Sequence, residues 1–187
     1  MATVDAPRMT VEEFLALPDD GVRRMLIDGE VREIGMTIRR WRHGDIQANI
    51  AYLLKAWLLT RPRPRGRVMD GDVGFRLATG TLVGTNIAYV SPELAAATPE
   101  SQAVFLGAPV LAAEVLSPSD KQEDVDDKVA AYLDAGVHHV WVVQPRFRTV
   151  TAYRPDSEQR LYTIRDDIDA EPHLPGFRAA VATIFED

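Results

Sequence analysis

The segment Pro109-Val-Leu-Ala-Ala-Glu-Val-Leu116 decides the fold, because after the proline it is apolar at every position except Glu114. An apolar run of this length, bounded by proline, is typical of a strand that is buried on both faces of a sheet. After a short loop, residues from about Gln122 to Ala135 have helical periodicity, and the apolar run from Val137 to Val143 predicts a further strand. A strand, a helix and a strand in this order predict a right-handed crossover between two parallel strands.

The rest of the chain carries further strand and helix signals around this unit. Thr10 begins a capping box, Thr-Val-Glu-Glu, which predicts a short helix to about Leu17. Asp28-Gly29 is a typical two-residue turn for a hairpin over residues 24–34. The remaining expected elements are a helix at 43–60 and strands at 68–77, 82–90, 149–153 and 160–164, with an irregular stretch after Pro92. This pattern predicts an α/β fold, more closely an α+β mixed sheet flanked by helices.

The length and composition favour one globular domain over residues 1–187, with residues 1–20 as an N-terminal helical extension. The chain has no cysteine, which excludes disulfides, thiolate metal sites and cysteine nucleophiles. No apolar stretch approaches the roughly 18 residues of a membrane span, and the start of the chain lacks a signal-peptide pattern. We therefore expect a cytoplasmic protein with no membrane contact.

The net charge of −7 argues against a protein that coats nucleic acid, but the basic residues are unevenly distributed. Two arginine-rich segments are candidates for contacts with the phosphates of a nucleic acid. The alternative is a solvated loop, stiffened in the second segment by proline. The candidate nucleic-acid-binding residues are Arg39, Arg40 and Arg42 in the first segment and Arg63 and Arg65 in the second.

Glu114 is a candidate functional residue because it places a carboxylate inside the predicted buried strand. An ionised carboxylate costs several kcal/mol to desolvate unless a cation, a metal ion or hydrogen-bond donors compensate it. Two explanations stay open for Glu114. It forms a structural ion pair with an arginine, or it belongs to a site that binds a metal or does chemistry.

Lys128 is the second candidate, because it falls on the apolar face of the predicted helix, between Tyr132 and Ala135. A lysine that points toward the sheet needs an anion, and Glu114 is the nearest candidate along the chain. The alternatives are a side chain that reaches back to water, or an i,i+4 pair with Asp124. Glu114 and Lys128 together indicate a carboxylate that holds a hard divalent cation and an ammonium that orients or stabilises charge.

The other polar residues considered are weaker candidates. Glu30 follows the hairpin turn and is within reach of a sheet edge, although an exposed hairpin residue is the simpler interpretation. His43 and Gln47 share the inward face of the long predicted helix, where a histidine is more often part of the core. His138 and His139 are adjacent on a strand and face opposite ways, which is a poor spacing for metal ligands.

The chain resembles a known family through a series of short motifs in a fixed order. These motifs are Thr10-Val-Glu-Glu-Phe-Leu-Ala-Leu-Pro18, Leu26-Ile-Asp-Gly-Glu30, Ile87-Ala-Tyr-Val-Ser-Pro92, Glu114-Val-Leu-Ser-Pro-Ser119, Lys128, Tyr132, Ala135-Gly-Val137 and Trp141. Together they resemble the Uma-two family of bacterial restriction-endonuclease-like proteins over residues 9 to 185. That family is similar to the PD-(D/E)XK nuclease superfamily. The resemblance implies a restriction-endonuclease-like fold, a bound magnesium ion (Mg²⁺) and hydrolysis of DNA phosphodiester bonds.

The resemblance also implies roles for individual residues. Glu114 would be the second acidic metal ligand, and Lys128 would orient the attacking water or stabilise the charge that develops on phosphorus. Glu30 would be the upstream acid, and the backbone carbonyl of Val115 a further metal ligand. His43 and Gln47 are possible accessory residues.

This chain departs from the family's pattern at three carboxylate positions. The family's central metal-binding aspartate corresponds to Asn86, which keeps an oxygen donor but loses a full charge. Met25 and Gln144 replace two further acids of the pattern. Asp70 and Asp72 are candidate replacements that the sequence does not place. These losses predict a partly degenerate metal site.

Three functions remain open at this point. The first is a divalent-metal-dependent endonuclease that hydrolyses DNA. The second is a catalytically inactive nuclease-fold protein that binds nucleic acid or assembles with partners. The third is a hydrolase of small phosphorylated metabolites, which requires a deep pocket. The resemblance further implies a homodimer, formed through edge strands near Trp141 or through the C-terminal strands.

Overall fold

The computed structural model describes residues 8–34, 41–78 and 80–186. The strands are β1 Arg23–Ile27, β2 Glu30–Ile34, β3 Arg67–Ala78, β4 Thr81–Val90, β5 Phe105–Leu106, β6 Leu111–Val115, β7 His139–Gln144, β8 Thr149–Arg154, β9 Ser157–Thr163, β10 Asp167–Asp169 and β11 Arg178–Ala180. The helices are α1 Val11–Leu15, α2 Trp41–Leu59, α3 Pro92–Ala97, α4 Gln122–Asp134 and α5 Val181–Phe185. Arg39 and Arg40 lie outside the described residues.

Nine of the described strands form a mixed sheet with the order β2-β1-β4-β6-β7-β8-β9, in which β3 pairs with β4 and with the short β5, and β10 and β11 form a separate two-stranded sheet. β6 and β7 are parallel neighbours, with Glu114 opposite Val142, and α4 connects them. β6 pairs on its other side with β4 in the antiparallel sense. The strand–helix–strand unit predicted from the sequence is therefore the centre of the sheet, and the predicted mixed α/β class is confirmed.

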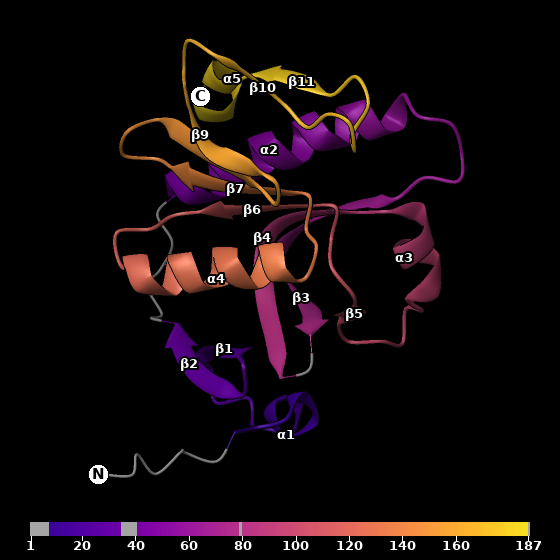
Figure 1. Ribbon diagram of the computed structural model, residues 1–187, viewed down its shortest axis with the longest axis vertical. Helices are drawn as coiled ribbons and strands as arrows, with labels where there is room; N and C mark the ends of the chain where they lie inside the picture. Colours follow the sequence, from indigo (N-terminus) through magenta and orange to yellow (C-terminus); the bar gives the residue numbers. More distant parts are fainter. Residues whose placement is uncertain (1–7, 35–40, 79, 187) are drawn as a thin grey trace.

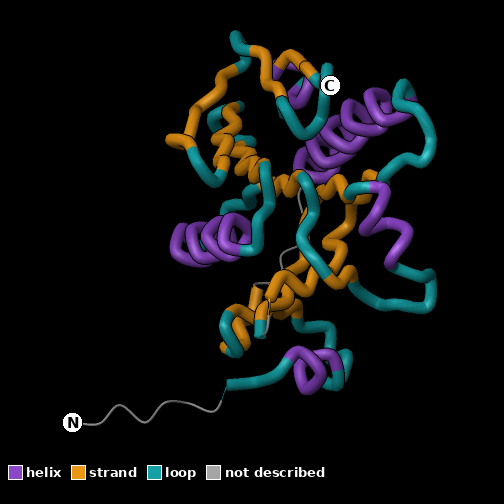
Figure 2. Tube along the Cα trace, turned by 45° about the vertical axis from the view of Figure 1, so that its right-hand side comes forward, coloured by secondary structure: helices purple, strands orange, loops and turns teal. Residues whose placement is uncertain are grey.

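Helices cover the two faces of the central strands (Figures 1 and 2). Leu111, Ala113 and Val115 of β6 belong to the apolar core under α2 and the C-terminal segment. Ala112 belongs to a separate core under α4, together with Val129. Because side chains alternate along a strand, Glu114 shares the face of Ala112 and points toward α4.

Most predicted elements occur at the expected positions. Thr10 caps α1 in a capping box with Glu13. Asp28 and Gly29 connect β1 and β2 with φ angles of 50° and 81°. Positive φ at both central residues is the geometry of a type I′ turn, which matches the twist of the two strands.

The structure corrects the expectation for residues 93–108 and for the end of the chain. The predicted irregular stretch contains α3, which Ser91 caps through its side chain and which has Pro92 at its first turn. β10, β11 and α5 follow the last predicted strand. Trp141 does not lie at an edge, because β7 is paired on both sides and the Trp141 side chain is only 1% exposed.

No helix in the described part of the chain is long and apolar enough to cross a membrane.

Three histidines meet where β7 contacts the C-terminal segment. The rings of His138 and His173 stack with their centroids 3.7 Å apart. His139 is buried, and its Nε2 lies 3.2 Å from Nδ1 of His173. Burial, together with the positive charge of Arg154, lowers the pKa of His139 from its ordinary 6.5 to about 4. His139 therefore accepts a proton only at a cost in folding free energy.

We predict that the folded state loses stability as the pH falls from 7 to 5. The folded pKa of His139 lies below the unfolded value, so the unfolded state binds the proton first and the loss begins below pH 6.5. The linkage between proton binding and folding predicts that the free energy of unfolding falls by about 2 kcal/mol between pH 7 and pH 5, before most carboxylates titrate. Urea unfolding at several pH values measures it, and His139→Gln should remove most of the dependence. An equal slope in wild type and variant would contradict the assignment.

Candidate active site

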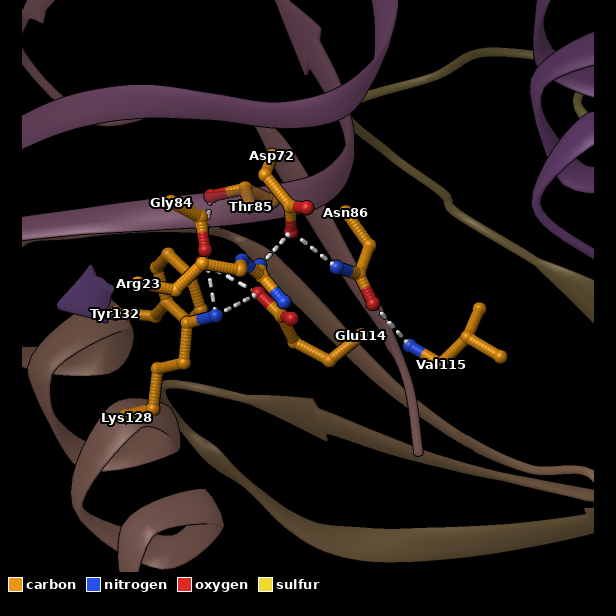
Figure 3. Close-up of polar contacts among 9 residues, drawn as sticks. All are labelled: Arg23, Asp72, Gly84, Thr85, Asn86, Glu114, Val115, Lys128 and Tyr132. Atoms are coloured by element: carbon orange, nitrogen blue, oxygen red, sulfur yellow. Dashed lines mark hydrogen bonds and ion pairs between the residues drawn. The ribbon is translucent and has the colours of Figure 1, made fainter. Parts of the chain in front are cut away.

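The Glu114 carboxylate lies at the carboxyl end of β6 and is compensated by two donors from α4 (Figure 3). Its Oε1 accepts a hydrogen bond of 2.7 Å from the hydroxyl of Tyr132 and lies 2.8 Å from Nζ of Lys128. Glu114 is therefore paired with a lysine and a tyrosine. The alternative explanation, an ion pair with an arginine, does not apply. Figure 3 draws no contact from the second oxygen, Oε2, to the other residues shown.

Lys128 is held between two strands. Its Nζ donates to the backbone carbonyl of Gly84 in β4 at 2.5 Å and faces Glu114 in β6. Asp124, the alternative helical partner, lies instead 3.7 Å from Arg32. The helical face predicted for Lys128 is therefore the observed one, and its side chain is only 13% exposed.

Tyr132 completes this arrangement from the next turn of α4. Its hydroxyl lies 2.5 Å from Oγ1 of Thr85 and donates to Glu114. Burial raises the pKa of Tyr132 well above its ordinary value, and the negative charge of Glu114 adds to this. Tyr132 therefore remains a neutral donor and cannot serve as a base. The sequence analysis placed Tyr132 on the apolar face of the helix and among the family motifs but gave it no role at the site; the available signal was that a buried tyrosine needs a hydrogen-bond partner.

Asn86 lies beside this pair and connects three strands. Its Nδ2 donates to Oδ1 of Asp72 in β3 at 2.7 Å, and its Oδ1 accepts the backbone amide of Val115 in β6 at 2.9 Å. Nη2 of Arg23 in β1 lies 2.7 Å from the same oxygen of Asp72. Only this orientation of the Asn86 amide satisfies both partners, since the carboxylate needs a donor and the backbone amide an acceptor.

These side chains line a cavity of about 570 Å³ between the β1–β2 hairpin, the loop after β6 and the start of α4. Carboxylates outnumber cations in its lining. The acids are Asp20, Glu33, Asp72, Glu114, Asp120 and Asp124, and the cations are Arg23, Lys121 and Lys128. An acidic concave surface of this kind favours cations.

Of the residues predicted from the sequence, Glu114, Lys128, Asn86 and Val115 meet at this cavity. Met25, which stands at one of the lost carboxylate positions, lines it as well. Gln144 ends β7 and is not part of the lining.

Glu30 requires a correction, because the structure places it outside the cavity. Its side chain is 68% exposed and lies 4.0 Å from Arg32. Successive side chains of a strand face opposite ways, so Glu33 of the same strand faces the cavity while Glu30 does not. Glu33, not Glu30, is the acid that β2 supplies to the cavity.

The accessory and arginine assignments also lie away from the cavity. His43 and Gln47 belong to α2, and neither is among the residues that line it; His43 is buried in the core. Arg63 and Arg65 belong to the segment of residues 60–66, which follows α2 and lies at the upper right of Figure 1, away from the β1–β2 hairpin. Nε of Arg65 donates to the Arg61 carbonyl in the same loop at 2.6 Å. Arg42 is exposed in the first turn of α2.

The oxygen donors at the cavity can be compared with the two common kinds of metal site, one that keeps several waters and one closed by protein ligands. Mg²⁺ binds through one or two carboxylates and keeps several waters. Glu114 and Asp72 provide carboxylates, and the Val115 carbonyl points to the same side of β6 as its amide. No three His, Cys, Asp or Glu side chains among the described residues gather closely enough to hold a metal. The donors therefore fit a water-rich magnesium site and do not fit a closed all-protein site.

Comparisons with known proteins agree with the fold. The family model Uma2, described as "Putative restriction endonuclease", matches residues 11–182. A crystal structure of "a putative nuclease belonging to DUF820" from Anabaena variabilis has a TM-score of 0.80 and 21% sequence identity. The match covers 95% of this chain and 97% of that one. A search of the curated proteins finds no match.

We predict that Lys128→Met destabilises the fold, because it leaves Glu114 without its cation. The free energy of unfolding at pH 7 should fall by about 3 kcal/mol, the usual cost of removing one partner of a buried ion pair. The double variant Lys128→Met/Glu114→Gln should lose less, since no buried charge remains. Urea denaturation measures both. A double variant as unstable as the single one would show that the pair does not act as a unit.

Proposed function

The chain belongs to the Uma2 restriction endonuclease family, and from this premise we propose that it is a nuclease that hydrolyses DNA phosphodiester bonds with a bound Mg²⁺. The observation that carries the proposal is the ion pair between Glu114 and Lys128. The two groups are 2.8 Å apart, nearly buried, and placed at the wall of a cavity. Desolvated charges at a cavity are typical of catalytic sites.

Lys128 has a donor left for a substrate. An ammonium has three N–H groups, and Glu114 and the Gly84 carbonyl account for two of them. The third is suited to a phosphate oxygen or to the water that attacks phosphorus. Because both other contacts are to rigid elements, the ammonium is held before the substrate arrives, which favours charge stabilisation in the transition state.

Glu114 and the Val115 carbonyl are the residues that would hold Mg²⁺. The bound ion would supply Lewis-acid activation of the phosphodiester. Tyr132 and Lys128 both contact Oε1 of Glu114, so Oε2 is the oxygen that we assign to the ion. The acidic lining repels phosphate when no cation is bound, so metal binding and substrate binding should be coupled.

A second candidate function is that of a catalytically inactive protein that binds nucleic acid or assembles with partners. Asn86 and Met25 favour it, because both line the cavity and neither carries a charge. A third candidate, hydrolysis of small phosphorylated metabolites, is favoured by the cavity volume, which is within the range of small-molecule sites. Affinity for duplex DNA that falls steeply with salt separates DNA binding from this third function.

The location and the oligomeric state also belong to the proposal. A DNA substrate is consistent with the cytoplasmic location expected from the sequence. The homodimer expected from the sequence remains part of the proposal as well.

We predict that the wild-type protein binds Mg²⁺ and nicks plasmid DNA only in its presence. Glu114→Gln should abolish metal binding in calorimetry, and Lys128→Gln should slow cleavage about 100-fold, the typical effect of one charge-stabilising donor. Glu30→Gln makes the same chemical change on an exposed residue outside the cavity and should leave both properties unchanged. Metal binding that survives Glu114→Gln would contradict the proposed site.

A further inference from the structure

A carboxylate from a neighbouring strand lies beside the position where the chain lacks one. Asn86 donates its amide to Asp72 at 2.7 Å, and both side chains line the cavity with Glu114. Building on the proposed function, we propose that Asp72 supplies the second carboxylate of the cation site and that Asn86 positions it. On this proposal, Asp72 of β3 provides the negative charge that Asn86 lacks.

A β-bulge brings Asp72 to this place. Asp70 pairs with Ile87, and Val73 pairs with Thr85, so two residues of β3 stand opposite the single residue Asn86. Gly71 and Asp72 adopt φ angles of 94° and 62° in the bulge. Bulges redirect a side chain that a regular strand would place elsewhere. Aspartate and asparagine tolerate the left-handed conformation better than most residues.

The strand opposite leaves room for the bulge. A Cβ atom on Gly84 would lie 3.2 Å from the carbonyl oxygen of Asp72. The same Gly84 offers its own carbonyl to Lys128. The backbones of β3 and β4 approach closely at Gly84, and Gly84 also holds Lys128. The positions of Asp72 and Lys128 therefore depend on the same residue.

The amide at position 86 suits an acid at position 72. An aspartate at 86 would have no hydrogen to donate and would place a second negative charge against Asp72. Asparagine removes the repulsion, donates to Asp72 and still accepts the Val115 amide. Asn86 is in this view a positioning residue, and Asp72 is the ligand.

Arg23 is the built-in competitor for this carboxylate. Its Nη2 lies 2.7 Å from Oδ1 of Asp72, and about a third of each side chain is exposed at the cavity. A divalent ion that binds Asp72 competes with the guanidinium. Because Arg23 is partly exposed, it can move into solvent when the ion enters.

Calorimetric titration with Mg²⁺ and with Mn²⁺ tests the proposal on isosteric variants. Asp72→Asn should weaken binding by about tenfold or more, because it removes one full ligand charge. The swap Asp72→Asn/Asn86→Asp should restore most of the affinity, and Arg23→Gln should increase it. Asp70→Asn, an exposed acid two residues away in the same strand, is the matched control and should bind like wild type. Thermal unfolding verifies that each variant is folded.

Two outcomes would overturn this inference and distinguish it from the proposed function. If Asp72→Asn binds like wild type while Glu114→Gln does not bind, the metal site stands and Asp72 is not its ligand. If wild type fails to bind while Asn86→Asp binds, Asp72 does not compensate for the lost acid. Failure of wild type and Asn86→Asp alike would reject the metal-dependent function itself.

An independent observation concerns the outer face of α2. The exposed residues 41, 48, 52, 55 and 59, together with the half-buried residue 45, follow the 4,3 spacing of a coiled-coil seam and form one stripe. Three of them are large and apolar: Trp41, Tyr52 and Leu59 are 72%, 71% and 60% exposed. The complete stripe, here called the α2 stripe, is Trp41, Asp45, Ala48, Tyr52, Lys55 and Leu59.

We infer that a second copy of the chain packs on the α2 stripe. The stripe is complementary to itself when two α2 helices run antiparallel about residue 50. Trp41 then meets Leu59 of the other copy, Ala48 meets Tyr52, and Asp45 meets Lys55. Large residues stand opposite small or aliphatic ones and the opposite charges face one another, which are the conditions for an isologous two-fold interface.

Sedimentation equilibrium tests this interface. Wild type should be a dimer, and Lys55→Asp should shift it toward monomer by placing two acids opposite one another. The charge exchange Asp45→Lys/Lys55→Asp should restore the dimer. Leu161→Asp, at an exposed apolar residue of the edge strand β9, should have no effect. A monomeric wild type, or a dimer that Leu161→Asp disrupts and Lys55→Asp does not, would overturn the inference.

Discussion

A carboxylate on a central strand must be compensated from outside that strand, because helices cover both faces of the sheet around it. In this protein the compensation comes from α4, where Lys128 and Tyr132 lie one turn apart and reach the same oxygen of Glu114. Both contacts would be lost if α4 rotated or shifted along its axis. Lys128 also binds the Gly84 carbonyl, so one ammonium joins α4 to β4 and β6.

The two faces of the sheet have different tasks. Under α2, the strands contribute an apolar core that includes Leu111 and Trp141, and this core accounts for the packing of the C-terminal segment. Under α4, the apolar contacts give way to polar ones toward the carboxyl end of β6. The β1–β2 hairpin stands beside this end and closes the cavity from the other side. The candidate chemistry is therefore placed on the α4 face, whereas the α2 face carries an apolar core.

The parts of the site that follow a local repeat could be predicted from the sequence. The predicted buried strand and the helical spacing were enough to indicate that Glu114 and Lys128 face one another. Glu30 was expected at the site through the family resemblance, whereas Glu33 is the acid of β2 that lines the cavity, because the register of the hairpin against the cavity depends on tertiary pairing. Asp72 could not be placed at all. Its position results from a shift in the pairing of β3 with β4, and neither strand pattern records that shift.

The bulge at Asp72 also determines how this site can change over time. An extra residue in one strand arises or disappears through a length change of a single codon, whereas the ligands on β6 and α4 can change only by replacement. Deleting Gly71 would restore regular pairing between β3 and β4 and remove the conformation that turns Asp72 toward Asn86. A one-residue deletion in β3 would therefore alter this end of the sheet without replacing any of its ligands.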